Sequence, residues 1–128
     1  MNILIVDNDV AVAETFRAAI HFKTDYMVSV AYGGKEAIDK IKTTPLYNLI
    51  ILDIMMPDVS GIDVCKMMVK DESLNKIPVL LVSALPVASP VFQESLGKFD
   101  ELNVIKGVLE KPFDIDNLIE KIKEVARV

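Results

Sequence analysis

Four short runs of apolar residues, each followed by a polar residue, constrain the fold of this 128-residue chain most strongly. Uninterrupted apolar runs of this length are typical of parallel strands that are buried on both faces. Because open α/β sheets bind ligands beyond the carboxyl ends of their strands, we expect the four polar residues to meet in one pocket. The runs and the residues that follow them are 3–6 with Asp7, 49–52 with Asp53, 79–82 with Ser83, and 108–109 with Lys111 two positions later.

Stretches with helical periodicity separate these runs, and residues 27–30 add a further strand. Regular alternation of strands and helices predicts an α/β fold with a parallel sheet and helices on both faces. The expected strands are residues 2–6, 27–30, 48–53, 77–82 and 106–110, and the expected helices start at the N-cap Asp9, cover 35–43 and 60–71, and start again near Asp114.

The stretch from residue 84 to residue 105 does not follow this alternation. Pro86 and Pro90 each remove a backbone N–H and disfavour helix at the preceding residue. A helix can restart with Ser89 as its N-cap and Pro90 at its first position. We therefore expect the fourth helix to be shortened or displaced.

Composition places the chain among compact globular proteins, with 52% apolar and 26% charged residues, and we expect residues 1–128 to form a single domain. No apolar stretch is long enough to span a membrane and the N-terminus lacks the order of a signal peptide, so we expect a cytoplasmic protein without membrane insertion. A net charge of −5 without a basic cluster longer than two residues argues against direct nucleic-acid binding. Since no linker or second domain follows, we expect any output to come from the surface of this domain or from a partner.

The single cysteine and the single histidine are both interpreted as structural. Cys65 lies in an apolar stripe at helical spacing, which favours a buried packing role. His21 has no second histidine or cysteine near it to complete a zinc site, so a structural or surface role is expected.

Two carboxylates, a hydroxyl and an ammonium in one pocket can hold a divalent metal and a phosphoryl group. A carboxylate that attacks phosphorus meets a dianionic donor, so a metal is needed to neutralise charge. Mg²⁺ suits a site that offers only oxygen ligands and leaves room for water. Lysine and serine then supply a mobile positive charge and one hydrogen bond to the phosphoryl oxygens.

These residues, with the stretch 52–61 (Leu-Asp-Ile-Met-Met-Pro-Asp-Val-Ser-Gly) and the sequence Lys111-Pro112-Phe113, resemble the receiver domain of two-component response regulators over essentially the whole chain. The resemblance implies a flavodoxin-like, doubly wound, five-stranded parallel sheet in the order 2-1-3-4-5. It also implies phosphorylation-dependent signalling, with a sensor histidine kinase or a phosphotransfer protein as donor and a further protein downstream. Enzymatic activity would be limited to self-phosphorylation from phosphodonors and autodephosphorylation.

The same resemblance implies roles for individual residues. Asp53 would accept the phosphoryl group, Ser83 would donate a hydrogen bond to it, and Lys111 would form an ion pair with it. The peptide between Lys111 and Pro112 is predicted to be cis, which would turn the lysine toward the pocket. The implied ligands of Mg²⁺ are Asp7, Asn8, Asp53 and the backbone carbonyl of Met55.

Three features depart from the family pattern. Asn8 stands where the family usually has a second metal-binding acid, and its amide oxygen adds no charge, so magnesium affinity should fall. Asp9 next to it is interpreted as a helix N-cap in preference to a metal ligand. Val108 replaces a Tyr or Phe that swings inward on activation in many receivers, and we interpret it as a strand-packing residue. The 111 − 83 = 28 positions from Ser83 to Lys111 exceed the family norm by several residues.

Two other functions remain open. A degenerate receiver that binds its partner regardless of phosphorylation is favoured by Asn8 and Val108, although the intact phosphorylation residues oppose it. A haloacid-dehalogenase-type phosphohydrolase would use Asp7 as nucleophile and Asp9 as general acid. Ala11 stands where that motif has Thr or Val, which weakens the interpretation.

Overall fold

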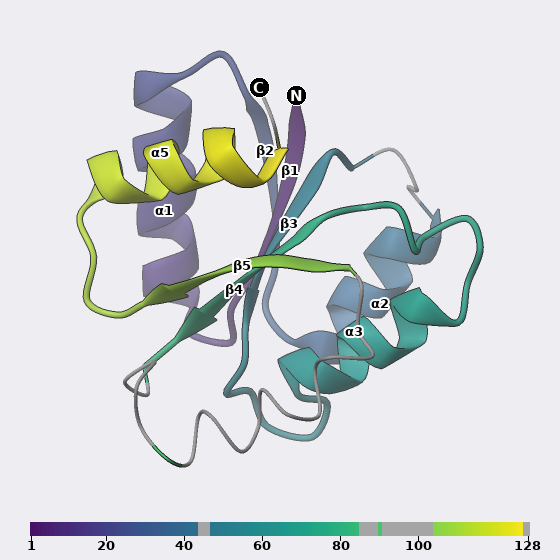
Figure 1. Cartoon of the computed structure of the whole chain (residues 1–128). Helices are drawn as coiled ribbons and strands as arrows, with labels where there is room; N and C mark the ends of the chain where they lie inside the picture. The colour runs from purple at the N-terminus through teal and green to yellow at the C-terminus, as the bar shows by residue number, and fades with distance from the viewer. Residues whose placement is uncertain (44–46, 85–89, 91–103, 127–128) are drawn as a thin grey trace.

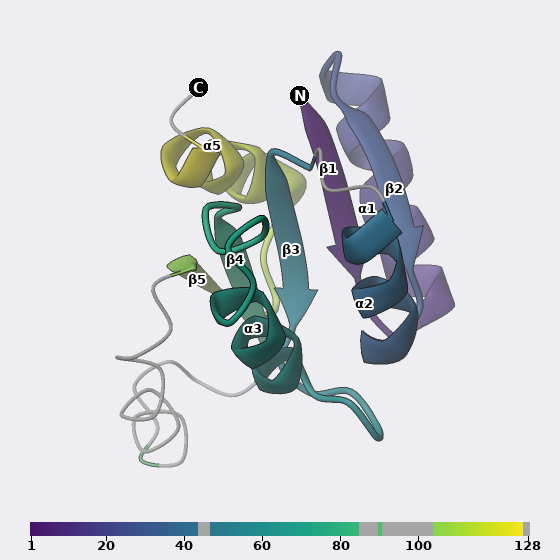
Figure 2. The same cartoon turned by 90° about the vertical axis from the view of Figure 1, so that its right-hand side faces the viewer.

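A five-stranded parallel sheet forms the middle layer of the protein, and the described helices cover both of its faces (Figures 1 and 2). The structure is a computed structural model and describes residues 1–43, 47–84, 90 and 104–126. The strands are β1 (Asn2–Val6), β2 (Met27–Ala31), β3 (Leu49–Asp53), β4 (Val79–Ser83) and β5 (Ile105–Glu110). The helices with described bounds are α1 (Val10–Lys23), α2 (Gly34–Thr43), α3 (Gly61–Val69) and α5 (Ile115–Ala126).

The strand order is β2-β1-β3-β4-β5 with every neighbouring pair parallel, which confirms the predicted fold. β3 lies at the centre, and its register pairs Leu52 with Val6 of β1 and Asp53 with Val82 of β4. The carboxyl ends of these three strands therefore lie side by side. Any polar residue that ends one of them is close to the other two.

Each face of the sheet has its own hydrophobic core. One core lies beneath α1 and α5 and the other beneath α2 and α3. Burial on both faces is confirmed for β3 and β4 and for nearly all of β1. The prediction of burial on both faces is wrong for Val108 and Leu109, which are only half-buried because β5 is an edge strand. Val108 packs against the α2–α3 core, as expected of a strand-packing residue.

Several predicted boundaries shift by one or two residues. Strand β4 begins at Val79 rather than at residue 77, because Pro78 has no N–H to give to the ladder. Helix α3 covers 61–69 rather than 60–71, with Ser60 as its N-cap and Lys70 as its C-cap. The expected shortening of the fourth helix falls almost entirely outside the described residues. Among the described residues, no helix combines the length and apolar character needed to cross a bilayer.

The single cysteine and the single histidine lie at positions that suit a structural or surface role. Cys65 lies on the buried face of α3, and burial raises the pKa of its thiol to about 12, so it packs as an apolar residue. His21 is exposed in the last turn of α1.

Two glycines allow the loops at the carboxyl end of the sheet to pack tightly. A Cβ on Gly61 would lie 2.5 Å from the backbone oxygen of Asp53, so the first turn of α3 sits directly against the end of β3. A Cβ on Gly34 would lie 2.5 Å from the backbone oxygen of Val59, so the β3–α3 loop packs on the start of α2. Larger residues at these positions would push the loops away from the end of the sheet.

We expect Gly61→Ala to lower the free energy of unfolding by roughly 2–3 kcal/mol, because the new methyl group must displace backbone. Gly33→Ala is the matched control, since a Cβ there meets no atom within 4 Å, and its effect should stay within about 1 kcal/mol. Urea denaturation followed by circular dichroism measures both variants. Equal stability of the two variants would contradict the close approach at Gly61.

Candidate functional site

The carboxyl ends of β1 and β3 bring two buried carboxylates together with one ammonium group. Asp7 and Asp53 are only 4% and 7% exposed. The Nζ of Lys111, from the loop after β5, lies 3.3 Å from Asp7 Oδ2 and 3.7 Å from Asp53 Oδ2. The lysine thus offsets part of the repulsion between the two acids.

Backbone amides hold the other oxygen of each carboxylate. The N–H of Asp9 donates to Asp7 Oδ1 at 2.9 Å, and the N–H of Met55 donates to Asp53 Oδ1 at 3.1 Å. In both cases the donor is two residues further along the chain, as in an Asx turn. Both side chains are therefore fixed on one side by their own loop and face Lys111 on the other.

Ser83 and Lys111 are linked through the backbone. Ser83 is fully buried at the end of β4, and its carbonyl accepts the N–H of Lys111 at 2.7 Å. The Lys111–Pro112 peptide is cis, as predicted. Phe113 follows and stacks on Phe16 of α1, with ring centroids 5.2 Å apart. The lysine loop is thus attached to β4 at one end and to α1 at the other.

The charge state of Asp53 reflects its position. Burial raises the pKa of its carboxyl above the ordinary value of 3.8, the ammonium of Lys111 opposes this, and the carboxylate of Asp7 adds to it. Because ionisation of such a carboxylate is costly, a cation that neutralises its charge, or a phosphoryl group bonded to it, stabilises the site.

The remaining predicted site residues lie further out. Asn8 is exposed and borders a hollow that is otherwise lined by the start of α2 and by the β3–α3 loop. The Met55 side chain is 56% exposed, whereas its backbone contacts Asp53. The side chain of Asp9 accepts the N–H of Val12 at 3.2 Å, which confirms the N-cap interpretation.

The oxygen atoms at this end of the sheet fit a hydrated hard cation. Among the described residues no group of three or more His, Cys, Asp or Glu side chains could hold a metal ion by itself. The oxygens that could contribute are the carboxylates of Asp7 and Asp53, the amide oxygen of Asn8 and the backbone carbonyl of Met55. So few protein ligands, all of them oxygen, suit a cation such as Mg²⁺ that retains several waters.

Some features of the site had not been predicted. The approach of Gly61 to Asp53 and the amide bonds from Asp9 and Met55 become visible only in three dimensions. The hollow beside Asn8 was also not predicted, although Gly34, which packs closely against Val59, was an available signal.

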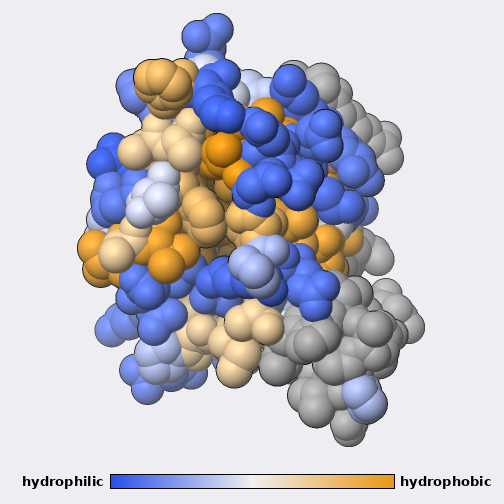
Figure 3. Space-filling view, turned by 90° about the vertical axis from the view of Figure 1, so that its left-hand side faces the viewer, coloured by the Kyte–Doolittle hydropathy of each residue, from blue (hydrophilic) through white to orange (hydrophobic). Residues whose placement is uncertain are grey.

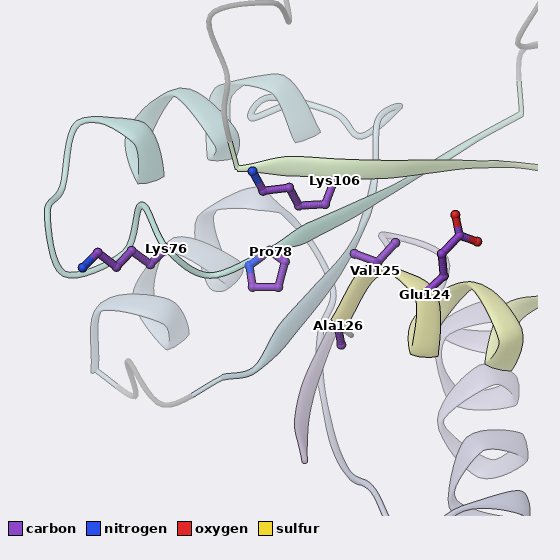
Figure 4. A pocket seen from close by; sticks show the side chains of 6 residues that line it. All are labelled: Lys76, Pro78, Lys106, Glu124, Val125 and Ala126. Carbon is purple, nitrogen blue, oxygen red and sulfur yellow. The ribbon is translucent and has the colours of Figure 1, made fainter. Parts of the chain in front are cut away.

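A second hollow, of about 330 Å³, lies at the opposite end of the sheet (Figure 4). Lys76 and Lys106 border it, but their side chains extend in the same direction rather than toward one another. The Glu124 carboxylate points away from Pro78. Its polar groups do not converge, and the chemistry of the protein is therefore expected at the carboxyl end of the sheet.

Comparison with known proteins finds matches over nearly the whole chain. Residues 3–123 match the model of the response regulator receiver domain family. The chain is 31% identical over 128 residues to the response regulator MprA of Mycobacterium avium, covering 99% of this chain and 51% of that protein. It is 30% identical over 130 residues to the DNA-binding dual master transcriptional regulator RpaA of Synechocystis, covering 98% of this chain and 48% of that protein. The chain thus spans about half the length of these curated relatives.

Solved structures share the fold over nearly the whole chain. The receiver domain of the Francisella response regulator 1452 superposes with a TM-score of 0.82 at 28% identity, covering 98% of this chain and 96% of that one. The chemotaxis protein CheY4 of Vibrio cholerae superposes with a TM-score of 0.84 at 23% identity, covering 97% of both chains. The second likeness concerns the fold alone.

The raised pKa of Asp53 predicts how stability depends on pH. The folded protein holds the Asp53 proton more tightly than the unfolded chain does, so ionisation costs stability as the pH rises from the unfolded value through the folded one. We expect Asp53→Asn to raise the free energy of unfolding at pH 7 without metal by on the order of 1 kcal/mol, and to lose this advantage below pH 4. Urea denaturation across this range measures the difference, with Asp39→Asn on the exposed face of α2 as control. A variant less stable than wild type at pH 7 would contradict it.

Proposed function

The chain belongs to the family of response regulator receiver domains, which act in phosphorylation-dependent signalling, and we propose that it accepts a phosphoryl group on Asp53. The proposal depends chiefly on one observation, the ammonium of Lys111 shared between two buried carboxylates. This arrangement places a nucleophilic carboxylate beside a positive charge that can bind the phosphoryl oxygens.

In the proposed transfer, a carboxylate oxygen of Asp53 attacks phosphorus. The bond from phosphorus to the donor imidazole nitrogen breaks, and its electron pair leaves with the imidazole. Met55 N–H holds Asp53 Oδ1, so the side chain needs little reorientation before attack. The Lys111 ammonium and the Ser83 hydroxyl would bind the transferred oxygens.

Mg²⁺ is the proposed cofactor. Asp7, Asp53, the amide oxygen of Asn8 and the backbone carbonyl of Met55 would hold it. When bound, it would neutralise negative charge on the phosphoryl oxygens. With a neutral amide at position 8, this protein brings fewer charges to the metal than receivers with an acid there.

The proposed phosphodonor is a sensor histidine kinase or a phosphotransfer protein. Figure 3 shows the face formed by α1 and α5, where apolar side chains form a band between hydrophilic areas. A shallow apolar hollow of about 210 Å³ beside Phe16 belongs to α1. Phe16 also stacks on Phe113, which belongs to the loop that carries Lys111. This link to the lysine loop supports α1 as part of the surface that a donor protein contacts.

Two alternatives are weaker. A phosphorylation-independent interaction module would have no physical need for Asp53, Ser83 and Lys111 together. A hydrolase of the haloacid dehalogenase type would need Asp9 as a general acid, but Asp9 caps α1. We propose no direct contact with nucleic acid, because the net charge is −5.

Labelling with a small phosphodonor tests the proposal directly. Wild-type protein incubated with acetyl phosphate and Mg²⁺ should gain one phosphoryl group by intact mass, and Asp53→Asn should gain none. A label mapped to Asp7 would favour the hydrolase. Wild-type protein that stays unlabelled would favour the interaction module.

The role of Asn8 can be tested through metal binding alone. We expect Asn8→Asp to bind Mg²⁺ about ten-fold more tightly, because an added carboxylate contact is worth roughly 1.4 kcal/mol. Isothermal titration calorimetry measures this, with Asn75→Asp as a control at an exposed position far along the chain from the site. Equal affinities of wild type and Asn8→Asp would exclude position 8 from the metal site.

A further inference from the structure

Two aromatic rings join helix α1 to the loop that carries Lys111. Phe16 of α1 and Phe113 stack with their ring centroids 5.2 Å apart and their planes 22° from parallel. Both side chains are half-buried and pack against the core beneath α1 and α5, which lie on the same face of the sheet (Figure 1). Stacking of this kind stabilises a structure beyond the burial of apolar area alone. The ring pair is therefore a specific contact between α1 and the lysine loop.

The lysine loop, residues 111–114, depends on this contact because much of it is exposed. It follows the edge strand β5, and the side chains of Pro112 and Asp114 are exposed. The backbone N–H of its first residue donates to the carbonyl of Ser83 at 2.7 Å, which attaches the loop to β4. Phe113 packs against the core and so attaches the loop on the α1 side.

The same helix also fixes one of the two acids. The N–H of Asp9, the N-cap residue of α1, donates to Asp7 Oδ1 at 2.9 Å. Phe16 lies 16 − 9 = 7 positions after Asp9, about two turns along the helix. Asp7 and the lysine loop are thus both attached to α1. The separation of 3.3 Å between Lys111 Nζ and Asp7 Oδ2 therefore depends on where the helix holds Phe113.

The position of the Lys111 ammonium depends in turn on the loop. A lysine side chain is a flexible hydrocarbon chain, so a fixed backbone limits the positions that its ammonium can reach. The Nζ atom lies 3.3 Å from Asp7 Oδ2 and 3.7 Å from Asp53 Oδ2, and the attraction falls as these distances grow. A charge that binds the phosphoryl oxygens acts well only from a fixed position.

We propose that Phe16 is a positioning residue for phosphoryl transfer, because its ring holds Phe113 and thereby keeps the ammonium of Lys111 beside Asp53. The inference rests on the proposed phosphorylation of Asp53. Phe16 acts through the lysine loop and takes no part in the chemistry itself. Its effect should therefore appear both in the rate of transfer and in how firmly the loop is held.

The rate of labelling by acetyl phosphate with Mg²⁺, followed by intact mass, measures the first effect. In this reaction an Asp53 oxygen bonds to phosphorus, the bond from phosphorus to the acetyl oxygen breaks, and acetate leaves with the electron pair. The small donor ensures that a loss of rate does not come from a lost contact between α1 and a donor protein. We expect Phe16→Leu, which stays apolar but loses the ring, to be labelled about five-fold more slowly. Phe16→Tyr, which keeps the ring, should be labelled at the wild-type rate.

Hydrogen exchange at the Lys111 amide measures the second effect without phosphorylation. We expect this amide to exchange about five-fold faster in Phe16→Leu than in wild type, the factor expected for the loss of one aromatic pair. Phe113→Leu removes the same pair from the other side and should also speed exchange. The combined variant should show less than the product of the two increases, because both substitutions remove one shared contact.

Tyr26→Leu is the matched control. Tyr26 is also a half-buried aromatic residue packed against the core beneath α1 and α5, but it precedes β2 at the opposite end of the sheet. We expect this variant to lower the free energy of unfolding in urea, as Phe16→Leu does. Both the labelling rate and the exchange of the Lys111 amide should stay at their wild-type values. All variants are compared under conditions in which circular dichroism shows them folded.

The outcomes separate this inference from the function on which it rests. Wild-type protein that acetyl phosphate does not label would overturn the proposed phosphorylation, and with it the role of Phe16 in transfer. Wild-type protein that is labelled, with an equal rate in Phe16→Leu, would overturn only the role of Phe16. Unchanged exchange of the Lys111 amide in Phe16→Leu would overturn the inference too, because the ring would not be holding the loop. Equal effects in Tyr26→Leu would assign them to general destabilisation and contradict the inference as well.

Discussion

The ammonium of Lys111 between the carboxylates of Asp7 and Asp53 is the interaction on which the site depends. Parallel strands at the centre of the sheet bring two buried acids together, and burial and the carboxylate of Asp7 both raise the pKa of Asp53. A single lysine at 3.3 and 3.7 Å offsets part of that cost. A phosphoryl group would pair with this ammonium, whereas a metal ion would compete with it for the carboxylate oxygens.

Much of the surrounding structure serves to hold this arrangement. The lysine loop is bonded to β4 through Ser83 and stacked on α1 through Phe113. On the other side, Gly61 lets α3 begin against the end of β3, so the loop that carries Met55 has little freedom. The acids, the lysine and their loops therefore form a preorganised unit, which would lower the reorganisation that the proposed phosphoryl transfer requires.

Asn8 sets the charge available at the proposed metal site. A neutral amide there reduces the negative charge that a metal would meet. The charge balance near the proposed nucleophile is thus less negative than in a receiver with an acid at this position. Such a balance favours the approach of anionic donors even where metal binding is weaker.

The sequence by itself determined the order of strands and helices, the parallel sheet and the residues at the strand ends. Apolar runs such as 49–52 and the polar residue after each of them are local signals, and one topological rule places those residues at the same edge. The N-cap at Asp9 was readable for the same reason, because a cap depends on neighbours within one turn. Tertiary structure alone decided that β5 is a half-exposed edge, that Gly61 packs against the end of β3, and that the Tyr32 hydroxyl donates to Glu14 of α1. The partners in such contacts lie far apart in the chain, 104 positions in the case of Lys111 and Asp7, so no local pattern of residue types specifies their distance.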